Sequence, residues 1–369
     1  MKKSTCNITK QNGFTLVEIM VALTISMTVL AGVMELYISN KKSYQLHESV
    51  ARIQEQGRFA MVFLKKELRL AGYMGCMSNK VKFTNNVDPS KYPSEVIAAA
   101  DLVVKSSNNG LAGSSIQAFN NVTTLPTTLL NLGLSIGSGE GEMITNTDVI
   151  LVRRSAYCPG GQVVAPLMGS QSANIKIADA SCPAGCCINK NDLVVISNCQ
   201  NADLFAVGNN ASASGGSHDT LTHSNALNTS NTLSIKYGLD ARVYKFQASI
   251  WYIGNGASGT PALFKKALSG NTLTTQEMVP DIENMQLLFG QDKTASGDAN
   301  HYVPADQLVN SANVVAIKAS FLVSSNKDAI TTKPRSVYYN GTIINSGEGS
   351  DRRLRRVFNA TIALRNRLK

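Results

Sequence analysis

The cysteines are the residues whose number and spacing most readily indicate chemistry. The chain has seven in 369 residues, and six of them lie in its middle part: Cys76, Cys158, Cys182, Cys186, Cys187 and Cys199. The spacing C-x3-CC-x11-C offers four thiolates for zinc, but the second C-x2-C pair of a zinc knuckle is missing. In an exported chain, an even number of cysteines predicts a disulfide framework instead. Cys186 and Cys187 are expected to bond to different partners, because a bond between neighbours is strained.

Two polar loops offer further ligands for a metal. The first contains His218, Asp219 and His223, and a mobile polar loop explains its composition without any metal. The second contains Asp292, Asp298, Asn300 and Asp306. It lacks the D-x-[DN]-x-[DN]-G order of a Ca²⁺ loop, so Ca²⁺ remains an open alternative and no other cofactor is indicated. Hydrolase, zinc-protease, phosphate-loop and dinucleotide-binding motifs are missing, and the sequence therefore indicates no enzyme.

Positive charge is concentrated at the two ends of the chain. The net charge is +10 at pH 7. Three basic residues lie before residue 14 and seven lie after residue 351, and together they equal this net charge: Lys2, Lys3, Lys10, Arg352, Arg353, Arg355, Arg356, Arg365, Arg367 and Lys369. The part between them is neutral in sum, which weakens the case for a broad nucleic-acid surface. The C-terminal arginines fit a solvated edge strand, and contact with DNA phosphates is the alternative.

An apolar segment near the N-terminus is long enough to cross a membrane. Residues 14–34 contain a single charge, Glu18, and as a helix they would span about 30 Å. The lysine-rich leader, residues 1–13, favours a cytoplasmic N-terminus. The apolar run is longer than the core of a secretory signal and has no small-residue cleavage site. The plausible processing bond, Gly13–Phe14, precedes the run, so cleavage there would keep the anchor.

Glu18 needs an explanation within this apolar segment. A carboxylate facing lipid costs about 2.5–3.5 kcal/mol near the centre of a helix, and less near the membrane boundary. One interpretation is a tolerated interfacial acid. The other is that Glu18 gains a cation when the helix leaves lipid, and the α-amino group created by cleavage before Phe14 is the best candidate. This cleavage would also remove Cys6 and leave six cysteines.

The hexapeptide G-F-T-L-V-E, from Gly13 to Glu18, resembles the class III signal of type IV pilins and pseudopilins. The resemblance implies that a prepilin peptidase cuts after Gly13 and methylates the amine of Phe14. It implies that Glu18 pairs with the N-terminal amine of a neighbouring subunit. It also implies a single-pass inner-membrane protein before assembly and a pilus or cell-surface protein afterwards. Some pseudopilins bind Ca²⁺, which keeps this ligand open for the loop around Asp292.

The helix is expected to continue beyond the membrane over residues 35–72. No proline occurs in residues 35–71, and small or apolar residues recur at steps of three and four: Val50, Ile53, Gly57, Ala60, Met61, Leu64, Leu68 and Ala71. This periodicity predicts an amphipathic helix with one buried stripe, which Gly72 ends. Together the two halves would reach about 87 Å. Gly32 and Gly57 lower the local helix propensity and could permit bending.

Residues 52–76 narrow the resemblance to minor pilins of the PilW type. The helix of these proteins ends in a Q-x-x-G-R-F-A stretch, followed by R-x-A-G-Y-x-G-C. The matching residues here are Gln54, Gly57, Arg58, Phe59, Ala60, Arg69, Ala71, Gly72, Tyr73, Gly75 and Cys76. The resemblance returns at residues 191–207, 279–292 and 352–367, where the last segment is similar to a structural strand of the family.

Residues 73–369 are expected to form one periplasmic or extracellular head rich in β-structure. Short apolar or alternating runs predict strands at 148–152, 193–196, 204–207, 232–235, 243–253, 262–266, 285–289, 314–323 and 357–364. Residues 254–261 predict a hairpin connection, and residues 208–231 and 291–313 predict surface loops. The expected fold class is α+β, with a long N-terminal helix, half membrane-spanning and half amphipathic, packed on a mainly antiparallel head.

These features favour a minor type IV pilin that helps to initiate pilus assembly and sits at or near the tip. A bulky head would crowd the shaft of a fibre, which argues for few copies. By resemblance, the partners are other minor pilins, the major pilin, the prepilin peptidase, the inner-membrane assembly platform and an adhesin-like tip protein. The alternatives are a minor pseudopilin of a type II secretion machine and a DNA-uptake pilus component with a DNA-binding basic tail.

Overall fold

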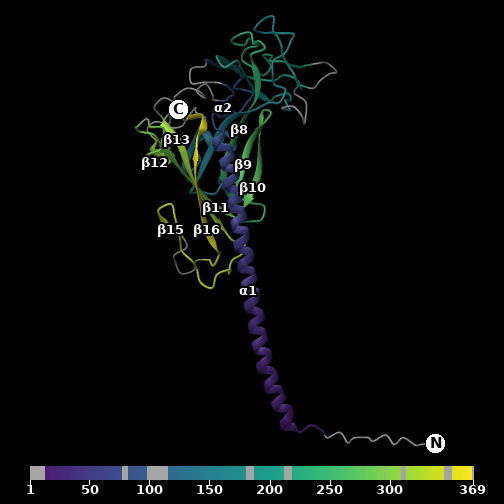
Figure 1. Ribbon diagram of the computed structural model, residues 1–369, viewed down its shortest axis with the longest axis vertical. Helices are drawn as coiled ribbons and strands as arrows, with labels where there is room; N and C mark the ends of the chain where they lie inside the picture. Colours follow the sequence, from purple (N-terminus) through teal and green to yellow (C-terminus); the bar gives the residue numbers. More distant parts are fainter. Residues whose placement is uncertain are drawn as a thin grey trace, which may run out of the picture.

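A computed structural model describes residues 13–76, 82–97, 115–179, 187–211, 218–294, 296–308, 313–344 and 351–367. One very long helix protrudes from a head made mostly of strands (Figure 1). The N-terminal end of this helix lies far from the head, and the chain ends within the head. The predicted α+β fold class, with a long N-terminal helix on a mainly antiparallel head, is confirmed.

The described helices and strands follow one another in a simple order. They are α1 (Leu16–Arg69), β1 (Lys82–Asn85), α2 (Ser94–Ile97), β2 (Ile116–Val122), α3 (Thr127–Asn131), β3 (Thr147–Ala156), β4 (Ile175–Ile177), β5 (Leu193–Ser197), β6 (Asn201–Ala206), β7 (Asp219–Leu221), β8 (Arg242–Asn255), β9 (Pro261–Ser269), β10 (Thr272–Pro280), β11 (Ile282–Gln291), β12 (His301–Val303), the 3-10 helix η2 (Ala305–Gln307), β13 (Val314–Ser324), β14 (Val337–Tyr339), β15 (Thr342–Ile344), β16 (Arg355–Ala363) and the 3-10 helix η4 (Arg365–Arg367).

Two sheets form the framework of the head. Within the described residues, the larger has eight strands in the order β1-β6-β5-β8-β3-β2, with β9 joined to β8 and β10 to β9. The β1–β6 pair is parallel and the other pairs of this sheet are antiparallel. The second sheet has four antiparallel strands in the order β12-β11-β13-β16. Residues of α1 and of both sheets share one hydrophobic core, which seats the helix on the head.

Helix α1 has different surroundings along its length. Its first half is exposed, and a buried stripe begins at Ser49 and runs through Ile53, Gln56, Gly57, Ala60, Leu64, Glu67 and Leu68. The predicted apolar stripe is confirmed, but its three buried polar members, Ser49, Gln56 and Glu67, were not predicted. The 54 residues of α1 correspond to about 81 Å. Gly72 follows the end of the helix with a φ of +73°, as expected of a residue that stops a helix.

Gly57 serves close packing between α1 and β16. A Cβ atom at this position would lie 2.4 Å from the ring of Phe358. Helix α1 continues without interruption past Gly57. The structure therefore gives this glycine a packing role, in place of the bend that its low helix propensity suggested.

Replacing Gly57 by alanine should destabilise the head by about 1–3 kcal/mol, because overpacking against Phe358 outweighs a gain of about 1 kcal/mol in helix propensity. A second change, Phe358→Leu, should recover part of the loss. Gly32→Ala is the matched control, because a Cβ there meets nothing within 4 Å. Denaturant unfolding, followed by the fluorescence of the single tryptophan, measures the effect. A Gly57→Ala protein as stable as the unaltered chain would contradict the packing role.

One predicted strand is wrong. Residues 232–235 are irregular because their amides bond elsewhere. The N–H of Leu233 donates to the carbonyl of Gln171 at 3.1 Å, and the N–H of Ser234 donates to the carboxylate of Asp203 at 3.1 Å. The segments predicted as surface loops also contain short strands, β7 and β12, and η2.

Candidate functional site

The predicted processing bond lies just outside the helix. Residues 13–15 are not helical, and the side chain of Phe14 is 84% exposed. Thr15 is extended, with φ −75° and ψ 152°, and α1 begins at Leu16. The Gly13–Phe14 bond is thus part of an exposed, non-helical segment that a peptidase can reach. Cys6 and the leader lysines lie outside the described residues.

Glu18 and Thr15 form a capping box at the start of α1. The backbone N–H and the hydroxyl of Thr15 both donate to Oε2 of Glu18, each at 2.9 Å. The N–H of Glu18 donates in return to the Thr15 hydroxyl at 3.3 Å. The pattern T-x-x-E in the sequence is the signature of this cap, although the cap was not predicted from it. The cap holds the Glu18 carboxylate beside the residue that follows Phe14, close to where cleavage would create the new amine.

The first half of α1 presents an apolar surface that its own head does not cover. None of its most apolar segment is buried inside the head. Large apolar side chains remain exposed from Leu16 to Ile38. By length and composition this half is suited to cross a membrane or to pack with other apolar helices.

The second half of α1 is fixed to the head by an ionic cluster around Glu67. Its Oε2 accepts from Nε of Arg154 at 3.0 Å, and its Oε1 accepts from Nζ of Lys265 at 2.8 Å. The Lys265 ammonium lies 5.4 Å from the ring centre of Trp251, whose Nε1 donates to Ser249 at 3.2 Å. Burial alone would raise the pKa of Glu67, but the bonds and charges of Arg154 and Lys265 outweigh it and hold this pKa below its ordinary value.

A second buried carboxylate, Asp281, contacts α1 nearer the start of its buried stripe. Gln56 donates to it from Nε2 at 2.9 Å, and Arg52 donates from Nε at 3.3 Å. The hydroxyl of Thr260 donates to the other oxygen at 2.8 Å. Asp281 lies between β10 and β11, so it joins α1 to both sheets.

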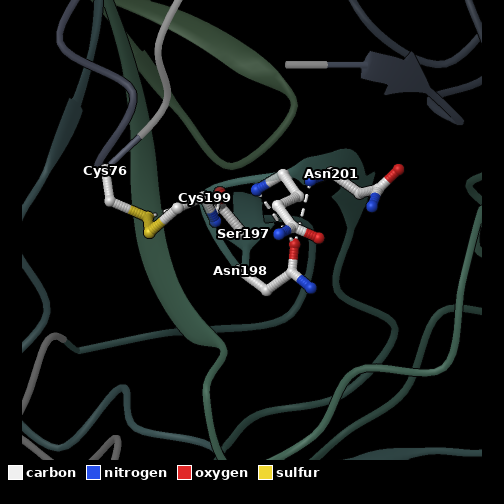
Figure 2. The surroundings of a disulfide bond; sticks show 6 residues. Cys76, Ser197, Asn198, Cys199 and Asn201 are labelled. Carbon is white, nitrogen blue, oxygen red and sulfur yellow. Dashed lines mark hydrogen bonds between the residues drawn. A yellow bond between two sulfur atoms is a disulfide. The ribbon is translucent and has the colours of Figure 1, made fainter. Parts of the chain in front are cut away.

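One disulfide joins the end of the helix region to the larger sheet. Cys76 and Cys199 are bonded across 123 residues of sequence, with their Cα atoms 5.0 Å apart. Figure 2 shows Cys199 in the tight turn between β5 and β6, next to Ser197 and Asn198. The N–H of Cys199 donates to the Ser197 hydroxyl at 3.1 Å, which fixes this turn.

The disulfide framework is confirmed where the structure describes it. Cys158 and Cys187 are also disulfide-bonded, whereas Cys182 and Cys186 lie outside the described residues. A zinc site built on the C-x3-CC-x11-C spacing would need Cys187 and Cys199 as thiolates, and both are engaged in disulfides. The prediction that Cys186 and Cys187 have different partners stays a prediction.

Removing the Cys76–Cys199 bond, by serine at both positions, should cost about 2–5 kcal/mol of stability, because the closed loop is long. Mass spectrometry of the unreduced mature protein should find no free thiol. Cys6→Ser is the matched control, because maturation would remove this cysteine and the mature protein should be unaltered. Two or more free thiols in the mature protein would contradict the framework and would reopen the metal alternative.

The two loops considered for metals have other roles. His223 is buried, its Nε2 lies 3.0 Å from the carbonyl of Ala173, and its ring packs against Phe205. Asp219 is buried in β7, so the expectation of a mobile polar loop is wrong there. Asp292 accepts from amides of its own loop, including that of Gly297 at 2.8 Å. In the described part of the chain no cluster of His, Cys, Asp or Glu has the arrangement of a metal site.

Two of the C-terminal arginines, Arg355 and Arg356, belong to the edge strand β16, as predicted, whereas the others precede it or lie in η4. Arg355 donates to Glu283 at 2.7 and 2.9 Å and to Asp351 at 2.6 and 2.8 Å. These two carboxylates raise the pKa of Arg355 and keep its guanidinium charged. Arg355 is therefore occupied within the head, which weakens the DNA alternative. Three arginines around the strand are exposed: Arg352, Arg356 and Arg365.

Two family models match separate parts of this chain. The family described as Type IV Pilus-assembly protein W matches residues 250–366, and the Prokaryotic N-terminal methylation motif matches residues 8–34. A type IV-like pilin from Thermus thermophilus is similar over 34% of this chain and 70% of its own, at 17% identity and a TM-score of 0.20. No curated protein matches significantly.

The methylation motif before an apolar helix, on an antiparallel β-rich head, defines a type IV pilin-like protein. Residues 250–366 are similar to the PilW family, so this part of the head is a PilW-type domain. The motif and the exposed apolar helix support membrane anchoring before assembly and a place on the pilus surface afterwards.

Proposed function

We propose that this chain is a minor type IV pilin that helps to initiate pilus assembly and sits at or near the pilus tip. The division of α1 into an uncovered apolar half and a half seated in the head carries the proposal (Figure 1). The first half can exchange lipid for the helices of other subunits while the head stays unchanged. The head, which runs from residue 73 to 369, is large for a subunit repeated along a shaft, and this supports a terminal place with few copies.

The mechanism begins with cleavage of the Gly13–Phe14 bond by the prepilin peptidase in the inner membrane. Cleavage removes the charged leader and leaves an amine next to the Glu18–Thr15 capping box. When the helix enters the bundle of pilin helices, the Glu18 carboxylate pairs with the amine of a neighbouring subunit. An ion pair formed away from water offsets the cost of a carboxylate among apolar side chains. The other partners are the minor and major pilins, the assembly platform and an adhesin-like tip protein.

Changing Glu18 to alanine should leave processing intact and reduce the number of pili about tenfold or more, because leaving the amine of the neighbour without its partner in an apolar bundle costs about 3–5 kcal/mol. Thr15→Ala separates this role from helix capping, since it removes the cap at a cost of about 1 kcal/mol but leaves the carboxylate. Glu35→Ala, an exposed acid on the same helix, is the matched control. Immunoblots report processing and electron microscopy counts pili. Unchanged piliation in Glu18→Ala cells would refute the ion pair.

Deletion of the gene distinguishes the pilus from the secretion machine. Loss of pili with intact protein secretion supports the proposal. Loss of secretion with normal pili would instead assign the chain to the minor pseudopilins.

A further inference from the structure

Strand β16 has an open edge. It pairs with β13 in an unbroken antiparallel register, from Arg355 opposite Ser324 to Ala363 opposite Ala316. The carbonyl of Leu354 accepts from Ser325 at 2.8 Å, and the N–H of Leu364 donates to Val315 at 2.9 Å. Even-numbered residues therefore direct their peptide groups to β13. The opposite edge belongs to Val357, Asn359, Thr361 and Ala363, whose peptide groups have no hydrogen-bond partner within the described residues.

This edge lacks most of the features that usually prevent strand addition. Proteins protect their edges with prolines, bulges, very short strands or charged side chains, and β16 has only the last of these, in the arginines at its start. Residues 355–363 contain no proline, no glycine and no register shift. The comparison within the head is clear, because β10 has a register shift after Glu277 and ends at Pro280, and β12 has three residues. Along the β16 edge, the exposed side chains of Asn359, Thr361 and Ala363 are small and uncharged.

The direction of β16 suits a neighbour in a pilus. Phe358 lies at Gly57, and Nδ2 of Asn366 donates to the carbonyl of Ala71 at 3.0 Å. Strand β16 therefore runs beside α1 in the same direction (Figure 1). Subunits whose apolar helices share one bundle have their helices nearly parallel, so a strand that follows the helix of the neighbour is aligned with β16.

Charge limits the kind of strand that fits. Arg356 and Arg365 are exposed near the two ends of the edge, and residues 352–369 contain no acid. Lys318 of β13 pairs with Thr361 and is exposed on the same face of the sheet as Thr361. A groove of about 270 Å³ begins at Val357 and Asn359 and includes Lys318 in its lining. A neighbour is therefore favoured when it carries carboxylates near both ends of its strand.

We propose that β16 accepts a strand from a different pilin subunit by β-strand addition, with main-chain bonds to residues 357, 359, 361 and 363. Carboxylates on the incoming strand pair with Arg356, Arg365 and Lys318. This proposal rests on the proposed function, because assembly brings the two heads together.

Photocrosslinking in cells tests the proposal with the full chain. A photoreactive residue at Thr361 should give an adduct with another pilin, whereas one at Thr274, exposed on β10, should give none. Position Leu30, on the apolar half of α1, is the positive control for assembly. For the variant test, the photoreactive residue is placed at Asn359. Thr361→Pro removes an N–H that does not bond to β13, so the melting temperature should stay unchanged. The yield of the Asn359 adduct should fall at least tenfold. Thr361→Ala should keep the yield.

The outcomes separate this proposal from the function that it rests on. Adducts at Leu30 without an adduct at Thr361 would overturn strand addition and leave assembly intact. An adduct with a second copy of this chain, or with a protein that is no pilin, would also overturn strand addition.

If Thr361→Pro lowers the melting temperature, the double variant Arg356→Glu with Arg365→Glu is used in its place, because these two changes leave the backbone unchanged. A normal adduct yield in this charge-reversed chain would overturn the proposal. Normal pili in the deletion strain would refute the proposed function alone.

Discussion

Gly13→Ala is expected to leave the chain at its full length, with its leader attached and no pili dependent on it. The bond after Gly13 lies in an exposed, non-helical segment, so access does not limit cleavage. A methyl group at this position meets no atom of the described residues within 4 Å. Any effect must therefore arise in the peptidase, which the pilin resemblance predicts to require glycine before the cut bond. Because the leader keeps its lysines on the cytoplasmic side, the uncut chain cannot leave the membrane.

Gly32→Ala is the matched control for this change, since Gly32 is also exposed on the apolar part of the chain and has free space around its Cα. It should be processed normally. The measurement is the mass of the extracted protein, which should include residues 1–13 in Gly13→Ala cells only. A mature N-terminus at Phe14 in the Gly13→Ala protein would contradict the assignment of the cleavage site.

Sequence pattern predicted the parts of the fold with the strongest apolar signal. The stripe from Ile53 to Leu68 has a helical period because one face of α1 is buried, and β3, β8 and β13 are apolar runs because both of their faces are largely buried; the structure confirms these elements. Strand β10, with the polar sequence TLTTQEMVP, was missed because its edge position leaves every residue but Val279 at least partly exposed. Residues 232–235 have a strand-like composition, but Asp203 captures the amide of Ser234.

The candidate site was predictable where it is local. Gly13, Phe14 and Glu18 form one short motif, and the cysteine count predicted disulfides. The pairing of Cys76 with Cys199 was not predictable, because it depends on a turn that lies 123 residues away in the sequence. The same holds for Glu67, whose partners Arg154 and Lys265 are 87 and 198 residues distant. In sequence, Glu67 is one more charge on an amphipathic helix.

The Glu67 cluster is one of the contacts that hold α1 on the head. The others are the buried stripe and the bonds of Asp281 to Gln56 and Arg52. Glu67 is the member with two cationic partners, and its side chain is 8% exposed. Removing one partner of a buried ion pair costs more than the pair contributes, because the remaining charges stay buried without compensation.

Glu67→Gln should therefore lower the free energy of unfolding by about 3 kcal/mol, because it leaves the charges of Arg154 and Lys265 together. Glu55→Gln, an exposed acid on the same helix, should change it by less than about 0.5 kcal/mol. The fluorescence of Trp251, which lies beside Lys265, reports unfolding at the cluster itself. Because Glu67→Gln weakens the packing of the head on α1, it should also reduce the amount of the chain that enters pili.

The pH dependence of stability isolates the ionised form of Glu67. Its folded pKa lies below its ordinary value of 4.5, so the folded state binds the proton more weakly than the unfolded state. The contribution of Glu67 is then complete above pH 4.5 and is lost as the pH falls through the folded pKa. The difference in stability between the unaltered chain and Glu67→Gln should shrink over this acidic range. A difference that stays constant down to pH 3 would show that the carboxylate is not the stabilising charge.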